Sequence, residues 1–377
     1  MCFVFFLFGY LCSANSVAQE SDFFLQIDEP ISTGVGATWS FPIFTDEQWF
    51  LASGQGGDLT IAPLDDFGVA NMEEVQTITD LGTIKDHALR MCPDGTFVYA
   101  ASTGIEEDVL VYTLDSDFSI LSQDILEQTE PPHAANDMAA ICGVGFKGVG
   151  VAELQGLRDF LYLVDNTGAL SIPIELAQSP RMTGAGMWEQ EGKLYVVGRD
   201  ALPELSISVY DQQYMLHEQY LLPPISTEIV NYWSASTVRI GDYIVLVSMG
   251  RDPQEAWPMD TGDVYLAILT TELELVEWIQ LTEFVPSAGG GMRPWLAFDG
   301  NMIWVSYDRA NKVELVALYI DETSFFGDEE SPVEPTSDQT DTSIDAEENG
   351  QEPKNNGCAG FVFFPLFCFY RKRLYQS

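Results

Sequence analysis

The chain has 377 residues, and its 46% of apolar side chains leaves ample material for a core. Its 58 acidic and 16 basic residues give a net charge of −42, which would repel phosphate backbones and so excludes nucleic-acid binding. Two interpretations of the acidity stay open, and both can hold together: a solvated surface suited to saline surroundings, or clustered carboxylates that collect divalent cations. Four of the six cysteines lie in the apolar termini, which excludes a disulfide-dense scaffold.

Residues 1–18 predict an export signal. The apolar run from Cys2 to Cys12 is too short to span a bilayer, and Ser16-Val17-Ala18 provides a small-x-small cleavage site after Ala18. The usual basic residues before the apolar run are missing. The alternative is a buried N-terminal strand or helix.

Residues 19–326 predict an all-β domain. No segment shows a sustained helical period, and short apolar runs broken by Gly, Pro, Asn and Asp follow one another throughout. The stretch from Cys92 to Ser102 is typical, because its Asp94-Gly95 pair suits a tight turn between two strands. Related stretches occur at 191–198, 240–248 and 299–306.

The spacing of these turns predicts a six-bladed β-propeller with four antiparallel strands per blade. The turns repeat every 44 to 59 residues, near Glu47, Gly95, Gly148, Gly192, Gly241 and Gly300. The innermost strands are then expected to begin near Ala37, His87, Asp137, Thr183, Trp233 and Gly291. The last blade lacks a fourth strand, so we expect residues 23–27 to supply it and close the ring.

Residues 327–356 predict an acidic, disordered linker. Pro, Ser, Thr and Gly separate ten acidic residues and one lysine, a composition that cannot bury enough apolar surface to order itself. The linker carries a charge of −9 and the following tail +3, so −36 belongs to residues 19–326. The acidity is therefore mainly a property of the folded domain.

The chain ends, at residues 357–377, with Gly357-Cys358, an apolar run and the basic cluster Arg371-Lys372-Arg373. This tail resembles the bacterial sorting tags of the Myxo-CTERM kind. The resemblance implies export by a Gram-negative bacterium, delivery to the cell surface or outer membrane, and processing near Cys358, with release from the cell as a further outcome. The alternative is an unprocessed anchor, and in both cases the tail is the only part expected to contact a membrane.

Two histidines fall where inner strands are expected to begin. His87 lies at the start of the second inner strand, and His133 precedes the third. Because such entry points cluster around one mouth of a propeller channel, both could face one ligand, as a base or as metal ligands. The alternative is a polar loop residue bonded to backbone, and His217 is expected on the surface.

The same register places further candidate binding residues at the entries to later blades: Arg181, Asn231, Tyr232, Trp233, Arg293 and Trp295. Arginines in an acidic protein suit a carboxylate or sulfate, and aromatic rings could stack on sugar or peptide. Ordinary packing between blades and salt bridging are the alternatives.

Asp86, Asp137 and Glu153 are candidate ligands of Ca²⁺, because carboxylate oxygens are its preferred ligands. The glycines between Gly143 and Gly148 match a dinucleotide-binding fingerprint by their letters. No helix is expected after them, so we interpret them as turn residues.

Cys92 and Cys142 lie 50 residues apart at equivalent places in neighbouring repeats. They could form a disulfide between blades two and three or remain two buried thiols, since the distance between them decides and sequence does not give it.

Together these features predict an exported, surface-tethered propeller that binds a protein, glycan or small acidic ligand at its channel mouth and meets the export and sorting machinery. The first alternative is a calcium-dependent hydrolase or lyase with its site in the channel, and the second is a structural component of a surface layer. Fold alone does not choose, because propellers host many chemistries.

Overall fold

The structure is a computed structural model that describes residues 21–36, 38–55, 57–79, 81, 84–103, 108–126, 135–143, 145–153, 158–176, 181–199, 205–226, 229–251, 262–283 and 292–327. The chain divides into two compact units, residues 1–329 and 330–377, and every described residue lies in the first. The predicted signal, linker and sorting segments therefore fall outside the described residues, apart from Gly327.

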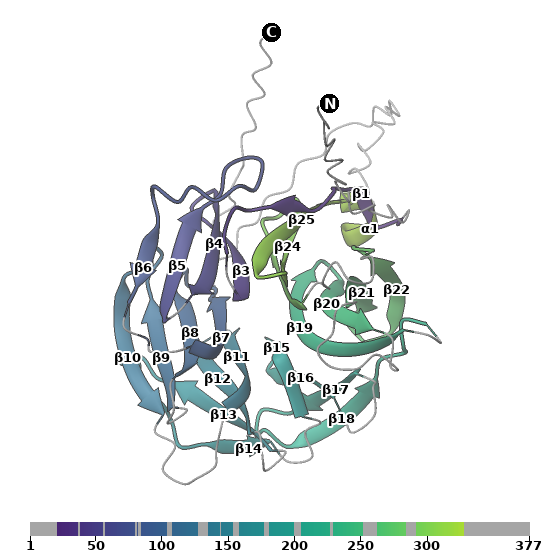
Figure 1. The fold of residues 1–377 in the computed structure, drawn as a ribbon. Helices are drawn as coiled ribbons and strands as arrows, with labels where there is room; N and C mark the ends of the chain where they lie inside the picture. Colours follow the sequence, from purple (N-terminus) through teal and green to yellow (C-terminus); the bar gives the residue numbers. More distant parts are fainter. Residues whose placement is uncertain are drawn as a thin grey trace, which may run out of the picture. The chain divides into compact units, whose positions relative to one another are not determined.

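The first unit is a six-bladed β-propeller, as the turn spacing predicts (Figure 1). From the axis outward, blade 1 consists of β3 (Thr38–Thr45), β4 (Gln48–Gln55), β5 (Asp58–Pro63) and β6 (Gln76–Ile78). In the same order, blade 2 consists of β7 (Ile84–Met91), β8 (Phe97–Thr103), β9 (Asp108–Leu114) and β10 (Ile120–Leu126). Blade 3 consists of β11 (Ala135–Gly143), β12 (Phe146–Glu153), β13 (Asp159–Val164) and β14 (Ile174–Leu176). Blade 4 consists of β15 (Arg181–Gln190), β16 (Lys193–Arg199), β17 (Leu205–Tyr210) and β18 (Leu216–Leu221). Blade 5 consists of β19 (Val230–Ile240), β20 (Tyr243–Arg251), β21 (Asp263–Thr270) and β22 (Leu275–Gln280). The first three strands of blade 6 are β23 (Met292–Phe298), β24 (Met302–Arg309) and β25 (Lys312–Ile320).

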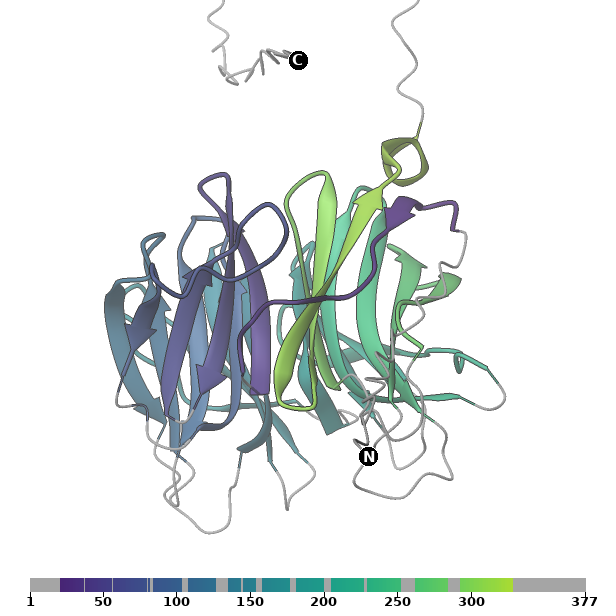
Figure 2. The same cartoon turned by 45° about the horizontal axis from the view of Figure 1, so that its top comes forward.

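The N-terminal strand β1 (Phe24–Ile27) is the fourth strand of blade 6, which confirms the predicted ring closure. It pairs antiparallel with β25, with Phe24 opposite Ile320, and β2 (Ile31–Ser32) pairs farther along the same strand. Figure 2 shows this purple segment beside the yellow-green strands of blade 6. Closure pairs a strand edge that would otherwise be exposed, and it ties the first strand of the domain to the last.

A short helix, α1 (Glu322–Phe326), follows β25. The carboxylate of Asp321 caps it by accepting a hydrogen bond from the backbone N–H of Thr323 (3.0 Å), and Phe325 packs on the ring of Phe23. Among the described residues, no helix is long and apolar enough to cross a bilayer.

The core lies between the faces of adjacent blades. Strands near the axis carry buried serines where large side chains would not fit between converging sheets: Ser53, Ser102, Ser248 and Ser306. The hydroxyl of Ser306 donates to the carbonyl oxygen of Ser40 in blade 1 (2.9 Å), so these positions also link blades.

The outer hairpins share one turn, which the sequence analysis missed. After the third strand of blades 1 to 4, an aspartate side chain accepts hydrogen bonds from the backbone N–H groups two and four residues later. The four aspartates are Asp65, Asp115, Asp165 and Asp211. The residue three places after each has positive φ, which explains Gly68 and Gly168. These four aspartates therefore have a structural role in turns.

One predicted turn is misplaced. Gly148 lies inside β12, opposite Ile141, and the left-handed turn residue of that hairpin is Gly145 (φ 84°). The run of glycines hides the turn because each of them suits a positive φ equally well.

Candidate functional site

All six inner strands are irregular where they begin. Each has a break in its pairing register with the second strand within its first few residues, as between Ile84 and Asp86 or between Met292 and Trp295. Such bulges turn side chains away from the regular alternation, and they are common beside functional sites. We call this end of the channel the entry end, and the opposite end, where the inner strands turn into the second strands, the hairpin end.

Asp308 and Arg293 of blade 6 meet Trp39 of blade 1 at the entry end. Asp308 Oδ2 accepts hydrogen bonds from the backbone N–H of Trp39 (2.8 Å) and from Arg293 Nη1 (3.2 Å). The Arg293 guanidinium lies over the Trp39 ring, 4.6 Å from its centre. Trp39 and Arg293 both have positive φ (69° and 52°), a strained conformation that the bulges impose.

The protonation state of Asp308 depends on its burial and on its neighbours. Burial raises the pKa of Asp308 to about 6, although the Trp39 amide and Arg293 favour its ionised form. Asp308 Oδ1 is also buried, and no described group donates a hydrogen bond to it. The site therefore holds a buried acceptor beside a partly exposed cation.

Asp86 and Asp137, on the first residues of β7 and β11, form a second acidic group. Asp86 accepts hydrogen bonds from the backbone amides of His87 (2.8 Å) and Met138. Burial, and then the charge of Asp137, raises the pKa of Asp86 well above its usual value. Asp86 Oδ2 is buried and has no hydrogen-bond partner in the described part of the chain. The structure thus brings together two of the three predicted calcium ligands.

The third predicted ligand, Glu153, ends β12, and its side chain lies outside the described residues. Within the described ranges, no group of three or more His, Cys, Asp or Glu side chains is arranged to hold a metal ion. The Ca²⁺ site stays a prediction.

His87 lies between blades 1 and 2, with no exposed surface. Its ring contacts Phe41 (4.7 Å between ring centres), Nδ1 lies 3.2 Å from the Tyr99 hydroxyl, and a Cβ on Gly54 would come within 2.6 Å of Cε1. Burial, and then the charge of Arg293, lowers the pKa of His87 to about 3, so the ring stays neutral. His87 is a packing residue in this position and does not line a surface that a ligand could reach.

The remaining predicted site residues divide into two groups. Trp295 is buried, with its ring edge-on to Phe41 (4.3 Å), so it belongs to the packing between blades 6 and 1. The second group lies outside the part of the chain that the structure describes. It consists of the whole of His133 and the side chains of Arg181, Asn231, Tyr232 and Trp233. His217 is exposed on β18, in keeping with its predicted place on the surface.

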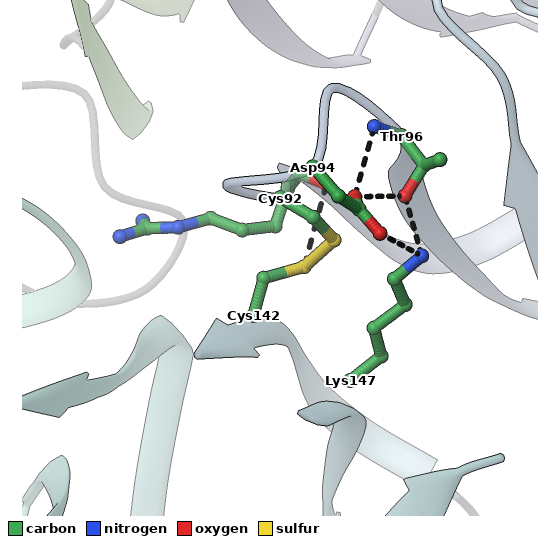
Figure 3. The surroundings of a disulfide bond; sticks show 6 residues. Cys92, Asp94, Thr96, Cys142 and Lys147 are labelled. Carbon is green, nitrogen blue, oxygen red and sulfur yellow. Dashed lines mark hydrogen bonds and ion pairs between the residues drawn. A yellow bond between two sulfur atoms is a disulfide. The ribbon is translucent and has the colours of Figure 1, made fainter. Parts of the chain in front are cut away.

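The hairpin end is built differently. Cys92 and Cys142 form a disulfide between blades 2 and 3, with their Cα atoms 5.0 Å apart. Beside it, Lys147 Nζ lies 3.0 Å from Asp94 Oδ2, and Figure 3 shows the link from this pair to Thr96. Cys92, Asp94 and Lys147 line a cleft of about 560 Å³ that reaches outward to the turn at Asp165.

Two charged residues of the channel, Asp308 and Arg90, are not among the residues predicted from the sequence. Asp308 lies near the end of the second strand of blade 6, and Arg90 lies near the end of the innermost strand of blade 2. The available signal in both cases was a charged residue near the end of a strand with apolar neighbours on one side, because such a residue is seldom buried without a partner.

No protein-family model and no curated protein matches this sequence. Among solved structures, the chain is similar to one described as a luciferin-regenerating enzyme, with 12% sequence identity and a TM-score of 0.46 over 77% of this chain and 95% of that chain.

Proposed function

We propose that this protein is an exported binding module that its C-terminal segment holds at the cell surface, and that it binds a glycan at the entry end of the channel. The supporting observation is the partly exposed guanidinium of Arg293, which lies over the Trp39 ring and beside the buried carboxyl groups of Asp308 and Asp86. A guanidinium can donate hydrogen bonds to carbohydrate hydroxyl groups, and hydrogen bonds to charged groups contribute about 1.5–3 kcal/mol.

The chemistry of the cluster separates the three ligand classes that the sequence left open. Carbohydrate hydroxyl groups can accept hydrogen bonds from the partly exposed Arg293 guanidinium without adding a charge next to the buried carboxyl groups. A small acid would bring its negative charge close to the carboxyl groups of Asp86, Asp137 and Asp308, and repulsion between these charges would weaken its binding. A protein ligand would need a broader surface than the partly exposed Arg293 side chain offers. A glycan therefore fits the described atoms best.

The test is binding of a panel of oligosaccharides to the protein and to Asp308→Asn and Arg293→Met. We expect at least one glycan to bind, and each substitution to weaken it about tenfold or more, because hydrogen bonds to charged groups contribute about 1.5–3 kcal/mol. The matched control is Asp117→Asn, on an exposed outer turn. Absence of glycan binding, or equal binding by Asp308→Asn, would contradict the proposal. Binding that a chelator abolishes would instead favour the calcium-dependent alternative.

The export and tethering parts of the proposal rest on the sequence of the termini. Mass spectrometry of the mature protein is expected to find an N-terminus at Gln19 and a C-terminus near Cys358. A peptide that runs through Ser377 would favour the unprocessed anchor, and one that begins at Met1 would contradict export by a cleaved signal.

A further inference from the structure

Arg90 crosses the channel near the hairpin end. It belongs to β7 in blade 2, and its Nη1 donates to the carbonyl oxygen of Thr237 on β19 in blade 5 (3.0 Å). Blades 2 and 5 are opposite each other in a ring of six, and Figure 1 shows β7 and β19 on opposite sides of the axis. The guanidinium therefore lies inside the channel and not in a single blade-to-blade contact.

The charge of Arg90 has no counter-charge among the described residues. A guanidinium has five N–H donors, and the carbonyl oxygen of Thr237 is the one acceptor that the described residues provide. Burial alone lowers the pKa of the Arg90 guanidinium, and no nearby carboxylate raises it. In a domain that carries −36, no acidic side chain of the described residues forms an ion pair with this cation. A partly buried cation without a counter-ion is destabilising, so an anion that reaches it would bind favourably.

A cavity of about 180 Å³ lies beside the guanidinium, walled by apolar side chains of blades 1, 2, 5 and 6. Its wall includes Phe41, Phe44, Leu89, Trp295, Ala297 and Phe298. For scale, an apolar cavity of about 150 Å³ in another protein accommodates benzene. Phe44 and Phe298 are partly exposed and Met91 is 45% exposed, so the cavity opens to solvent at the hairpin end.

We propose that this cavity binds a small monocarboxylic acid with an apolar body, of about the size of benzoate. The carboxylate would accept hydrogen bonds from Arg90, and the apolar body would contact the aromatic wall. A ligand with both a carboxylate and an apolar body suits this site best. A neutral ligand would leave the charge of Arg90 without a counter-ion, and an inorganic anion would leave the apolar wall in contact with water. This site is independent of the glycan site proposed for the entry end.

The first test is titration calorimetry of the protein with sodium benzoate and with benzyl alcohol, which has a similar shape without the charge. We expect benzoate to bind and Arg90→Met to weaken it about tenfold or more, the usual effect of losing a charge-assisted hydrogen bond. Benzyl alcohol should bind the two proteins equally. The matched control is Arg239→Met, which removes an exposed arginine of blade 5 that bonds its own turn.

Three outcomes would overturn the proposal: no benzoate binding, equal benzoate binding by Arg90→Met, or displacement of benzoate by sulfate at equal concentration. If Arg90→Met does not fold, Ala297→Leu provides a second test, because it fills the cavity and leaves the guanidinium in place. Ala297→Leu must then abolish benzoate binding, and retained binding refutes the proposal. Asp308→Asn should leave benzoate binding unchanged, so failure at one end of the channel is distinguishable from failure at the other.

Discussion

The two ends of the channel hold the blades together by different physical means. At the entry end, buried ionisable groups join neighbouring blades: Asp308 bonds the backbone of blade 1, and Asp86 bonds the backbone of blade 3. At the hairpin end, the links are a disulfide, a partly exposed ion pair and a bond from Arg90 to a carbonyl oxygen across the channel.

This difference means that the two ends should respond to different conditions. A carboxyl group buried among backbone amides changes its charge with pH, so the entry end is expected to be pH-sensitive. A disulfide does not titrate, but it is sensitive to reductant. In an oxidising environment the disulfide at the hairpin end would stay intact whatever the pH.

The largest expected effect is loss of the disulfide. Cys92→Ala with Cys142→Ala should lower the free energy of unfolding by up to about 4 kcal/mol, because the bridge closes a long loop in the unfolded chain. Chemical denaturation with and without reductant is the measurement. Reductant should destabilise the wild-type protein by a similar amount and leave the double variant unchanged. A double variant within about 1 kcal/mol of wild type would show that the hairpin end does not depend on this link.

The pH dependence of the entry end is the next largest effect. Because the pKa of Asp308 is raised from 3.8 to about 6, the folded state binds more protons than the unfolded state between these values. The contribution of Asp308 to stability is therefore greatest below pH 3.8 and is lost as the pH rises through about 6. The loss amounts to at most about 3 kcal/mol, since one pKa unit corresponds to 1.36 kcal/mol.

The test is the free energy of unfolding of wild type and Asp308→Asn from pH 4 to pH 7. Asp308→Asn keeps an acceptor for the Trp39 amide but cannot ionise, so it should gain stability relative to wild type as the pH rises. Asp117→Asn, on an exposed turn, should give a curve parallel to that of wild type. Parallel curves for Asp308→Asn and wild type would contradict a raised pKa at this position.

Most of the fold could be predicted from the sequence, because propeller blades repeat. The second blade shows the accuracy: strands expected at 87–92 and 108–114 are found at 84–91 and 108–114. Ring closure could be predicted because the last blade lacked a fourth strand and an apolar segment before the first blade had no assigned place. The third blade was less accurate because its glycines fit several turn positions equally.

Much less of the site could be predicted, because the register that locates an inner strand does not fix the side of the sheet on which a residue lies. His87 and Asp86 are neighbours in the chain, yet His87 faces the aromatic rings of blade 1 and Asp86 bonds the backbone of blade 3. A shift of one residue exchanges these two faces, and the bulge between Ile84 and Asp86 introduces such a shift. Arg90 and its opposite partner Thr237 are 147 residues apart, a contact that no local pattern contains.

The smallest expected effect concerns the ion pair beside the disulfide. Lys147 and Asp94 have side chains that are 21% and 58% exposed, so solvent screens their attraction and Lys147→Met should lower the free energy of unfolding by only about 0.2–1 kcal/mol. The pKa of Asp94 is lowered to about 2, chiefly by the hydrogen bond from the Thr96 hydroxyl and less by Lys147. Thr96→Val should therefore raise the pKa of Asp94 more than Lys147→Met does, as measured by NMR titration of the carboxyl carbon. The reverse order would show that charge, and not the local hydrogen bond, controls this turn, and that the hairpin end shares the pH sensitivity of the entry end.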